Sequence, residues 1–429
     1  MRILFLTPYP PSRIRVRGYE FLTQLHRNHD VIVMTQCASE QEQADVETLR
    51  QRGYEVVVVQ EAKREAMLRS GLALFSGQPL QVAYARSARF RRAIQDLCAQ
   101  RTFDILHVEH LRGIASIAAH THPIGPLVWD AVDCISLLCK HAAKAGPTLQ
   151  VRAVALLEQK RTQRYEANMA QRFHHITVTS ERDRQALIDL QRSRTGDLTS
   201  SDDALGAGIQ VLPNGVDLDY FRQLNQPRRR FNIVFSGKMS YHANIATALF
   251  LYRQIMPLIW QQRPEATLTI VGSKPPKSLQ LLARDPRVEV TGYVADMRPY
   301  VGRAGVMLSP MVYSVGIQNK VLEAMALGTP VVIAAQAAGA LGARSGRDLL
   351  VASSAQEFAG ATLRLMDDAA LRASLGQFGR EYVEHHHDWD VLTGKLVEVY
   401  RQAIAHHTVN NPASPNVGAR FIASAGVER

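Results

Sequence analysis

The sequence predicts an α/β protein built from two Rossmann-like domains, each with a parallel sheet. Its 429 residues exceed one ordinary core and suffice for two domains of about 200 residues. Short apolar strands alternate with helices in both halves of the chain, which is the pattern of parallel sheets. The stretch Val306–Ala334 contains a complete strand–helix–strand unit. These three observations together favour two similar α/β domains.

The first half opens with a strand, MRILFLT, followed by the loop PYPPSRIRVRG and a helix over Gly18–Asn28. Further strands are expected at DVIVMT, YEVVVVQ (Tyr54–Gln60), DILHVEH (Asp104–His110), PLVWDAVD (Pro126–Asp133) and HHITVTS (His174–Ser180). A long helix is expected over Leu149–Phe173, and the polar stretch Arg194–Gly208 predicts a mobile loop.

The second half repeats this organisation. Its strands are expected at FNIVFSG (Phe231–Gly237), ATLTIVG, VEVTGYV, VMLSPM and PVVIAA, with a helix over Ile245–Gln262. The expected divisions are an N-terminal domain (1–212), a linker (213–230), a second domain (231–388), a C-terminal helix (389–408) and a disordered tail (409–429).

The composition is that of a soluble globular protein, with 46% hydrophobic and 21% charged residues. The four cysteines form no C-x-x-C pair, which favours a reducing, cytoplasmic compartment. No apolar run reaches the roughly 18–20 residues that span a bilayer. The N-terminal apolar run breaks at prolines, so it predicts a first strand and not a signal peptide.

The formal charge of +11 predicts an anionic partner: nucleic acid, acidic lipid or a phosphorylated substrate. The densest basic cluster is RSARFRR (Arg86–Arg92), which leads into a helix with Phe90, Ile94 and Leu97 on one face. This pattern indicates either an interfacial helix on an anionic membrane or a surface helix docked on its own domain. Aromatic residues make up 7% of the chain and form no patch interleaved with basic residues, which argues against a nucleic-acid binder.

The stretch VGIQNKVLEAMALGTPVV (Val315–Val332) predicts an anion site. Good helix formers run over Gln318–Leu327, and Gly328 and Pro330 end the helix. The helix therefore begins at the carboxyl end of the preceding strand. The first N–H groups of such a helix lack internal partners and bind anions.

Two polar residues of this helix suggest what the anion is. Lys320 lies in the first turn and Glu323 lies three residues later on the same face, roughly 4–5 Å along the axis at about 1.5 Å per residue. This spacing suits a diphosphate beside Lys320 and a ribose whose hydroxyls donate to Glu323. The alternative is a surface Lys–Glu pair that adds a few tenths of a kcal/mol to the helix.

The stretch resembles the donor-site motif of family 4 glycosyltransferases, retaining enzymes of the GT-B fold. Their motif has two glutamates separated by seven residues, the second followed by a segment like EAMALGTPVV. Glu323 matches the second glutamate, whereas Val315 stands in place of the first. The words GIQNKVLEAMA resemble a subgroup of sugar transferases associated with exopolysaccharide, and PNGVD resembles the family's motif near the linker.

The resemblance implies two Rossmann-like domains facing across a cleft, with the donor in the second domain and the acceptor mainly in the first. It implies sugar transfer, with retention, from a UDP- or GDP-sugar to a glycan or polyisoprenyl-linked acceptor in bacterial exopolysaccharide biosynthesis. No cofactor, metal or nucleic acid is expected, and the enzyme would work in the cytoplasm or at the inner face of the membrane. The alternatives are a nucleotide-sugar 2-epimerase of the same fold and a non-catalytic nucleic-acid binder.

The resemblance also assigns residues of the second domain. Lys238 and Lys320 would be catalytic, neutralising the diphosphate without a metal. Backbone groups near Gly316 and Ile317 would replace the contact that the first glutamate makes to the donor sugar. The expected donor-binding residues are Gly237, Tyr293, Val294, Gly316, Ile317, Gln318, Asn319 and Glu323.

In the first domain, the end of DILHVEH carries the expected catalytic residues Glu109 and His110, beside the donor sugar. Strand periodicity points His107 and Glu109 one way and His110 the other, so the sequence leaves open which side faces the cleft. Arg13 and Arg15 lie in the loop that replaces the family's Gly-Gly turn, and they are expected either to reach into the cleft on the acceptor side or to be solvated.

Asp130 and Asp133, also at a strand end, are expected either to bind acceptor hydroxyls or to cap a turn. The three consecutive histidines His385–His387 cannot easily converge on one metal ion.

Overall fold

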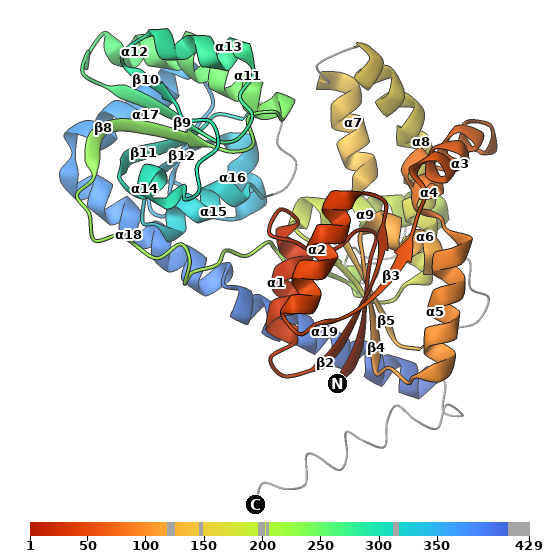
Figure 1. Ribbon diagram of the computed structural model, residues 1–429. Helices are drawn as coiled ribbons and strands as arrows, with labels where there is room; N and C mark the ends of the chain where they lie inside the picture. Colours follow the sequence, from red (N-terminus) through yellow and green to blue (C-terminus); the bar gives the residue numbers. More distant parts are fainter. Residues whose placement is uncertain (118–124, 146–148, 196–201, 203–205, 312–316, 411–429) are drawn as a thin grey trace, which may run out of the picture. The chain divides into compact units, whose positions relative to one another are not determined.

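The computed structural model describes residues 1–117, 125–145, 149–195, 202, 206–311 and 317–410 (Figure 1). The chain divides into two compact units, Met1–Leu212 with the segment from Thr393 onward, and Pro213–Leu392. Each unit contains one parallel sheet flanked by helices, as the alternation of strands and helices predicted. The expected disordered tail lies, from residue 411 on, outside the described residues, as does most of the polar loop.

The sheet of the first unit has seven strands whose neighbours are all parallel. In spatial order they are β3 (Glu55–Gln60), β2 (Asp30–Cys37), β1 (Arg2–Thr7), β4 (Ile105–Glu109), β5 (Leu127–Val132), β6 (Ile176–Val178) and β7 (Ile209–Val211). Leu4 of β1 lies opposite Ile32 on one side and Leu106 on the other, and all three are buried. Strands β2 and β3 lie on one side of β1, whereas β4 and the strands that follow it lie on the other side. The carboxyl ends of β1 and β4 therefore form a topological switch point.

Among the described residues, nine helices of the first unit precede β7, and a tenth follows most of the second unit. They are α1 (Val16–Leu25), α2 (Glu40–Gln51), α3 (Lys63–Ser76), α4 (Leu80–Ala85), α5 (Ala88–Gln100), α6 (His110–Ile117), α7 (Ile135–Ala145), α8 (Leu149–Arg172), α9 (Glu181–Thr195) and α19 (Trp389–Asn410), among the described residues. Tyr400 of α19 is fully buried and shares a hydrogen bond of 2.9 Å with His107 of β4. This contact fixes the end of the chain to the first sheet.

The sheet of the second unit has six parallel strands. In spatial order they are β10 (Val288–Val290), β9 (Thr267–Val271), β8 (Arg229–Ser236), β11 (Ala304–Ser309), β12 (Val331–Ala334) and β13 (Leu350–Ala352). The switch point of this sheet lies between β8 and β11.

Two apolar clusters cover the two faces of this sheet, one under α11, α12 and α17, the other under α14, α15 and α18. The helical segments are α11 (His242–Phe250), the π-helical η1 (Leu251–Ile255), α12 (Met256–Trp260), α13 (Lys277–Gln280), the 3-10 turn η2 (Leu281–Arg284), α14 (Arg298–Gly302), α15 (Asn319–Ala326), α16 (Ala335–Leu341), α17 (Ala355–Asp367) and α18 (Ala369–His386). The single helix expected over Ile245–Gln262 thus contains a π-helical turn just before Pro257, whose ring nitrogen cannot donate to the preceding turn.

The basic segment Arg86–Arg92 leads into a helix docked on its own domain, which is one of the two interpretations that the sequence left open. Phe90 and Ile94 of α5 are 1% and 0% exposed and belong to the core of the first unit, and Leu97 packs against the same core. The apolar face of α5 is therefore already covered by its own domain. Across the described part of the chain, no helix is both long and apolar enough to cross a bilayer.

Candidate functional site

The switch point of the second sheet gathers the charged residues predicted to hold a diphosphate. β8 ends at Ser236 and is followed by Gly237 and Lys238, and β11 leads through Met311 towards α15. Because β8 and β11 are neighbours, the turn after one and the helix after the other meet at the same edge. Ligands of open α/β sheets bind at such an edge.

Lys320, in the first turn of α15, points at the turn after β8. Its Nζ donates to the Asn244 side-chain oxygen at 2.6 Å, approaches Met311 Sδ at 3.6 Å, and lies 4.4 Å from the centre of the Phe235 ring. Burial lowers the pKa of Lys320 to about 8, and Glu323 opposes this shift. A cation held at a helix N-terminus favours the binding of an anion there.

Gly237 makes room for this arrangement. Its φ is +149°, a conformation that residues with a Cβ rarely adopt, and a Cβ would lie 3.2 Å from Lys320 Nζ and 2.8 Å from the Asn244 amide nitrogen. Any side chain at position 237 would therefore displace the lysine from the mouth of the site.

Asn244 is a residue that the sequence did not reveal. It lies in the first turn of α11 and is 6% exposed. Its side-chain oxygen accepts from Lys320, and its side-chain nitrogen donates to the Lys238 backbone oxygen at 3.0 Å. Asn244 thus ties the backbone of one predicted phosphate lysine to the ammonium of the other, whereas the side chain of Lys238 is exposed.

Glu323 lies one turn beyond Lys320 and is partly buried. Burial raises the pKa of Glu323 to about 7, and Lys320 opposes the rise. At neutral pH this carboxyl group is therefore divided between its ionised and neutral forms, and hydroxyl donors would favour the ionised form.

The N-terminus of α15 has no side-chain cap. The N-cap residue, Gln318, instead uses its side-chain oxygen to accept from Ser309 Oγ at 2.5 Å, and its side-chain nitrogen is buried without a partner among the described residues. Asn319 accepts from the Asn214 side chain at 3.3 Å, and Ile317 packs on the core. Gly316 and Val315 lie outside the described residues.

The residues expected near the nucleobase follow β10. Tyr293 is 80% exposed, whereas Val294 packs against the core. A tyrosine ring left in solvent at the ligand-binding edge of a sheet is available for stacking.

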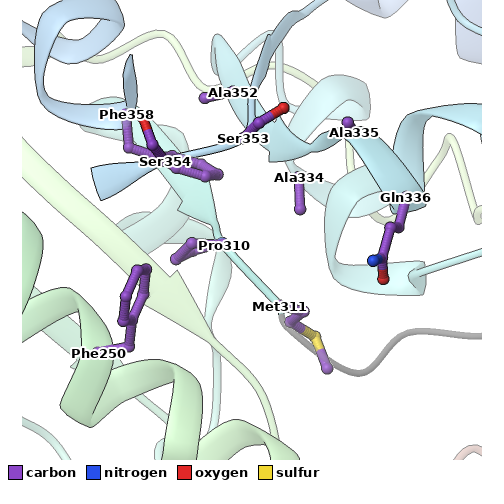
Figure 2. A pocket seen from close by; sticks show the side chains of 10 residues that line it. All are labelled: Phe250, Pro310, Met311, Ala334, Ala335, Gln336, Ala352, Ser353, Ser354 and Phe358. Carbon is purple, nitrogen blue, oxygen red and sulfur yellow. The ribbon is translucent and has the colours of Figure 1, made fainter. Parts of the chain in front are cut away.

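A cavity of about 220 Å³ lies at the carboxyl ends of β11, β12 and β13, beside the lysine cluster (Figure 2). Phe250, Met311 and Phe358 are among its apolar lining residues, and Gln336 and Ser353 among the polar ones. None of the described lining residues is ionisable, so this cavity lacks the charge that a diphosphate requires. Met311 lines this cavity, and its Sδ lies 3.6 Å from Lys320 Nζ.

The carboxyl edge of the first sheet, at and beside its switch point, carries two backbone outliers among the described residues. His110, the first residue of α6, has φ of 67°, and Val132, at the end of the neighbouring β5, has φ of 68°. Such conformations are costly for residues with a Cβ, above all for a β-branched one, and they cluster at functional sites. The His110 Nδ1 accepts from the Arg112 backbone at 3.3 Å, and burial lowers the pKa of His110 to about 4, so the ring is neutral at pH 7.

Glu109, the last residue of β4, is 5% exposed and lies against the first turn of α1. A Cβ on Gly18 would lie 2.6 Å from a Glu109 carboxyl oxygen, so only glycine leaves space for this carboxyl group. Burial, reinforced by Asp130, raises the pKa of Glu109 to about 8. At pH 7 the group is mainly protonated and can donate a hydrogen bond.

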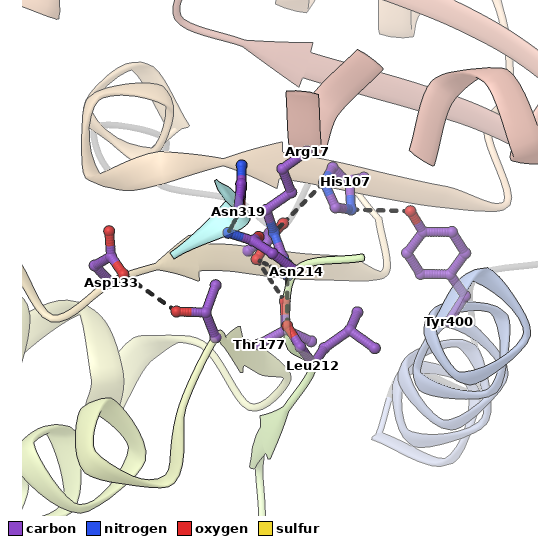
Figure 3. A network of polar contacts seen from close by, with 10 residues as sticks. Arg17, His107, Asp133, Thr177, Leu212, Asn214, Asn319 and Tyr400 are labelled. Atoms are coloured by element: carbon purple, nitrogen blue, oxygen red, sulfur yellow. Dashed lines mark hydrogen bonds and ion pairs between the residues drawn. The ribbon is translucent and has the colours of Figure 1, made fainter. Parts of the chain in front are cut away.

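Asp130 is fully buried, and its partners Arg17, Thr177 and His107 are labelled in Figure 3. Both of its oxygens accept from the Arg17 guanidinium, at 2.7 and 2.9 Å, and one accepts from Thr177 at 2.9 Å. His107 lies 3.9 Å from the same carboxylate and bonds to Tyr400. The carboxylate of Asp130 is thus held by buried partners within the first unit. Asp133 accepts from Thr179 at 3.1 Å, and burial raises the pKa of Asp133 to about 6.

The two loop arginines differ in their surroundings. The guanidinium of Arg15 donates to Glu42 at 2.8 Å and to the Pro10 oxygen at 3.1 Å, and it covers the Tyr9 ring. Arg13 is exposed. Of the two, Arg13 is the one whose charge is available to a ligand. Within the described residues, no three metal-ligating side chains are brought together.

Comparison with known proteins supports the class of enzyme that the sequence predicted. Residues 230–368, which include Lys238, Lys320 and Glu323, match the family model described as Glycosyl transferases group 1. The chain is 28% identical to D-inositol 3-phosphate glycosyltransferase of Salinispora arenicola over 267 residues, which cover 53% of this chain and 56% of that protein. The chain thus matches about half the length of its curated relatives.

Solved structures show the same fold over almost the whole chain. HepE of Anabaena, crystallised in complex with UDP, superposes with a TM-score of 0.66 at 16% identity, covering 94% of this chain and 100% of that one. Sucrose-phosphate synthase of Thermosynechococcus elongatus gives a TM-score of 0.64 at 16% identity, covering 95% and 100%. The fold is GT-B, as predicted.

Proposed function

We propose that the chain is a retaining glycosyltransferase that moves a sugar from a nucleotide-diphosphate sugar to a glycan or lipid-linked acceptor in bacterial exopolysaccharide synthesis. The observation that carries the proposal is the cluster at the second switch point, where Asn244 holds the Lys320 ammonium beside Gly237 and the uncapped N-terminus of α15. The family match over residues 230–368 supports it.

The second unit would bind the donor. The diphosphate would accept from the first N–H groups of α15 and from Lys320 and Lys238, which together supply positive charge without a metal ion. Glu323, one turn further, would accept from the ribose hydroxyls. The base would lie near the backbone of Tyr293 and Val294. A UDP- or GDP-sugar is proposed, and the complexes of HepE with UDP and with UDP-glucose favour UDP.

Gln318 would compensate for the absence of the first motif glutamate, whose place Val315 takes. Its side-chain nitrogen is a buried donor without a partner among the described residues. A donor sugar hydroxyl would supply the missing acceptor, together with backbone groups near Gly316 and Ile317.

In the reaction, the bond between the anomeric carbon and the diphosphate oxygen breaks, and a bond to the acceptor hydroxyl oxygen forms on the same face. The acceptor proton passes to the departing diphosphate oxygen, whose charge Lys320 and the helix N-terminus stabilise. Neutral His110 and protonated Glu109 would hold hydroxyls of the donor sugar. Arg13 and Asp133 would contact the acceptor.

The test is thermal unfolding of the whole chain with UDP-, GDP-, ADP- and TDP-sugars. A donor present at 100 times its dissociation constant adds about 2.7 kcal/mol of stability. The expected result is a rise in melting temperature with UDP- or GDP-sugars that Lys320→Met abolishes. No shift with any of the four would overturn the proposed donor site. Conversion of the donor to its 2-epimer without an acceptor would favour the epimerase.

A further inference from the structure

Large apolar side chains that are exposed to solvent concentrate on two helices of the first unit. Among the described residues, ten of the sixteen lie on α3 or in the first nine residues of α8. Eight of these side chains define what we call the α3–α8 surface: Met67, Leu68, Leu72, Phe75, Leu149, Val154, Leu156 and Leu157. An apolar surface of this extent on a folded domain marks an interaction site.

Helix α3 has its apolar residues on the side opposite to that of an ordinary surface helix. The small residues Ala66 and Ala73 are 3% exposed and face the domain. Leu68, Leu72 and Phe75 are spaced along one face and are 68%, 71% and 91% exposed. The helix therefore packs on its own domain through small side chains and presents the large ones outward.

Helix α8 contacts α3 at the C-terminal end of α3. The Arg161 guanidinium of α8 donates to the backbone oxygens of Ala73 and Leu74 in α3, at 3.1 and 2.8 Å. Glu158 of α8 accepts from the Leu80 backbone at 2.7 Å, just beyond α3. Figure 1 shows α3 beside α8.

The charges around this surface are mainly positive. Lys63 and Arg64 lie in the first turn of α3, and Lys160 lies on α8; all three are exposed. Among the described residues, none of the three has a carboxylate within ion-pair distance, whereas Glu65 pairs with Arg89 at 3.4 Å. Apolar side chains beside such cations match a lipid interface, where the acyl region takes the former and anionic headgroups take the latter.

We propose that the α3–α8 surface docks on an anionic lipid membrane, with Leu68, Leu72 and Phe75 in the acyl boundary and Lys63 and Arg64 among the phosphates. A second copy of the chain fits less well, because a two-fold contact through this surface would bring the same cations together. None of these residues belongs to the donor site, so membrane docking and sugar transfer can be tested independently.

The experiment is co-sedimentation of the whole chain with vesicles of phosphatidylglycerol and phosphatidylcholine, and with phosphatidylcholine alone. The expected result is binding to the anionic vesicles that weakens with salt. Leu72→Ser with Phe75→Ser should lower the partition coefficient at least about tenfold, because two large apolar groups no longer enter the interface. Lys63→Ala with Arg64→Ala should lower it about 30-fold on anionic vesicles only, at about 1 kcal/mol for each charge.

The matched controls are Leu281→Ser and Arg284→Ala, both exposed in the second unit, which should bind vesicles like the wild type. All four α3 side chains to be changed are exposed, so the melting temperature should stay unchanged. Equal vesicle binding by both α3 variants and the wild type would overturn the proposal. So would a self-association of the wild type that the α3 variants lose while vesicle binding persists.

Discussion

Replacing Lys320 by methionine should stabilise the protein while abolishing donor binding. The pKa of Lys320 falls from its ordinary 10.5 to about 8 because the ammonium is buried. A folded-state pKa below the unfolded one means that the charged lysine destabilises the fold. The difference between the two values corresponds to about 3 kcal/mol at pH 7, where the lysine is charged in both states.

Methionine removes this cost but also the hydrogen bond to Asn244, worth about 1 kcal/mol. The expected gain in unfolding free energy is therefore about 2 kcal/mol at pH 7. Above pH 8 the folded lysine loses its proton, so the cost in the wild type declines as the pH rises towards 10.5. Near pH 9.5 about 1 kcal/mol remains, and the gain should vanish.

The assay is urea unfolding of both proteins at pH 7 and pH 9.5, with UDP binding measured by calorimetry at pH 7. Lys238→Met is the control, because that exposed side chain should change stability by no more than about 0.5 kcal/mol at either pH. If Lys320→Met were less stable than the wild type at pH 7, or gained the same unfolding free energy at both pH values, the claim that burial of the charged Lys320 destabilises the fold would be refuted.

Four further predictions concern the same site. Glu323→Gln should raise the dissociation constant of the donor and cut turnover without unfolding the protein; unchanged donor binding and turnover would contradict the ribose contact. Asn244→Leu should weaken UDP binding about tenfold by releasing Lys320, whereas Asn244→Asp should retain it, and equal affinities in calorimetry would remove Asn244 from the site. Donor affinity should be highest between pH 7 and 8, where Glu323 is ionised and Lys320 still charged, and sugar transfer should survive excess EDTA; a flat pH profile or an absolute need for Mg²⁺ would oppose this assignment.

The fold was predictable because the sequence pattern that specifies its strands and helices is local. Runs of apolar residues separated by helices specify parallel strands, and the structure has them at the expected places, with the ends of some strands shorter than expected. The strand expected over His174–Ser180, for example, pairs only through Ile176–Val178. The apolar pattern predicts that a strand exists, whereas the length of the strand depends on how many residues of the neighbouring strand pair with it.

The helix after Arg86 shows why an amphipathic pattern alone could not choose between its two interpretations. Phe90, Ile94 and Leu97 do form one apolar face, as the spacing predicted, but periodicity does not tell whether the face meets a membrane or a core. Helix α3 shows the opposite arrangement of large apolar residues. Its alanines and its large apolar residues lie on different faces, and only burial distinguishes the face that packs from the face that is exposed.

Asn244 could not be found from the sequence because its partner Lys320 is 76 residues away, and a lone asparagine near a helix start ordinarily serves as a cap.

The choice between Glu109 and His110 could not be made from strand periodicity, because the strand ends between them. Side chains alternate only while the backbone stays extended, and His110 leaves that region with φ of 67°. Glu109 therefore keeps its strand direction and is buried against Gly18, whereas His110 is directed by the first turn of α6. Both can serve one ligand, since a protonated carboxyl group donates and a neutral imidazole can donate from its Nε2 while its Nδ1 accepts from Arg112.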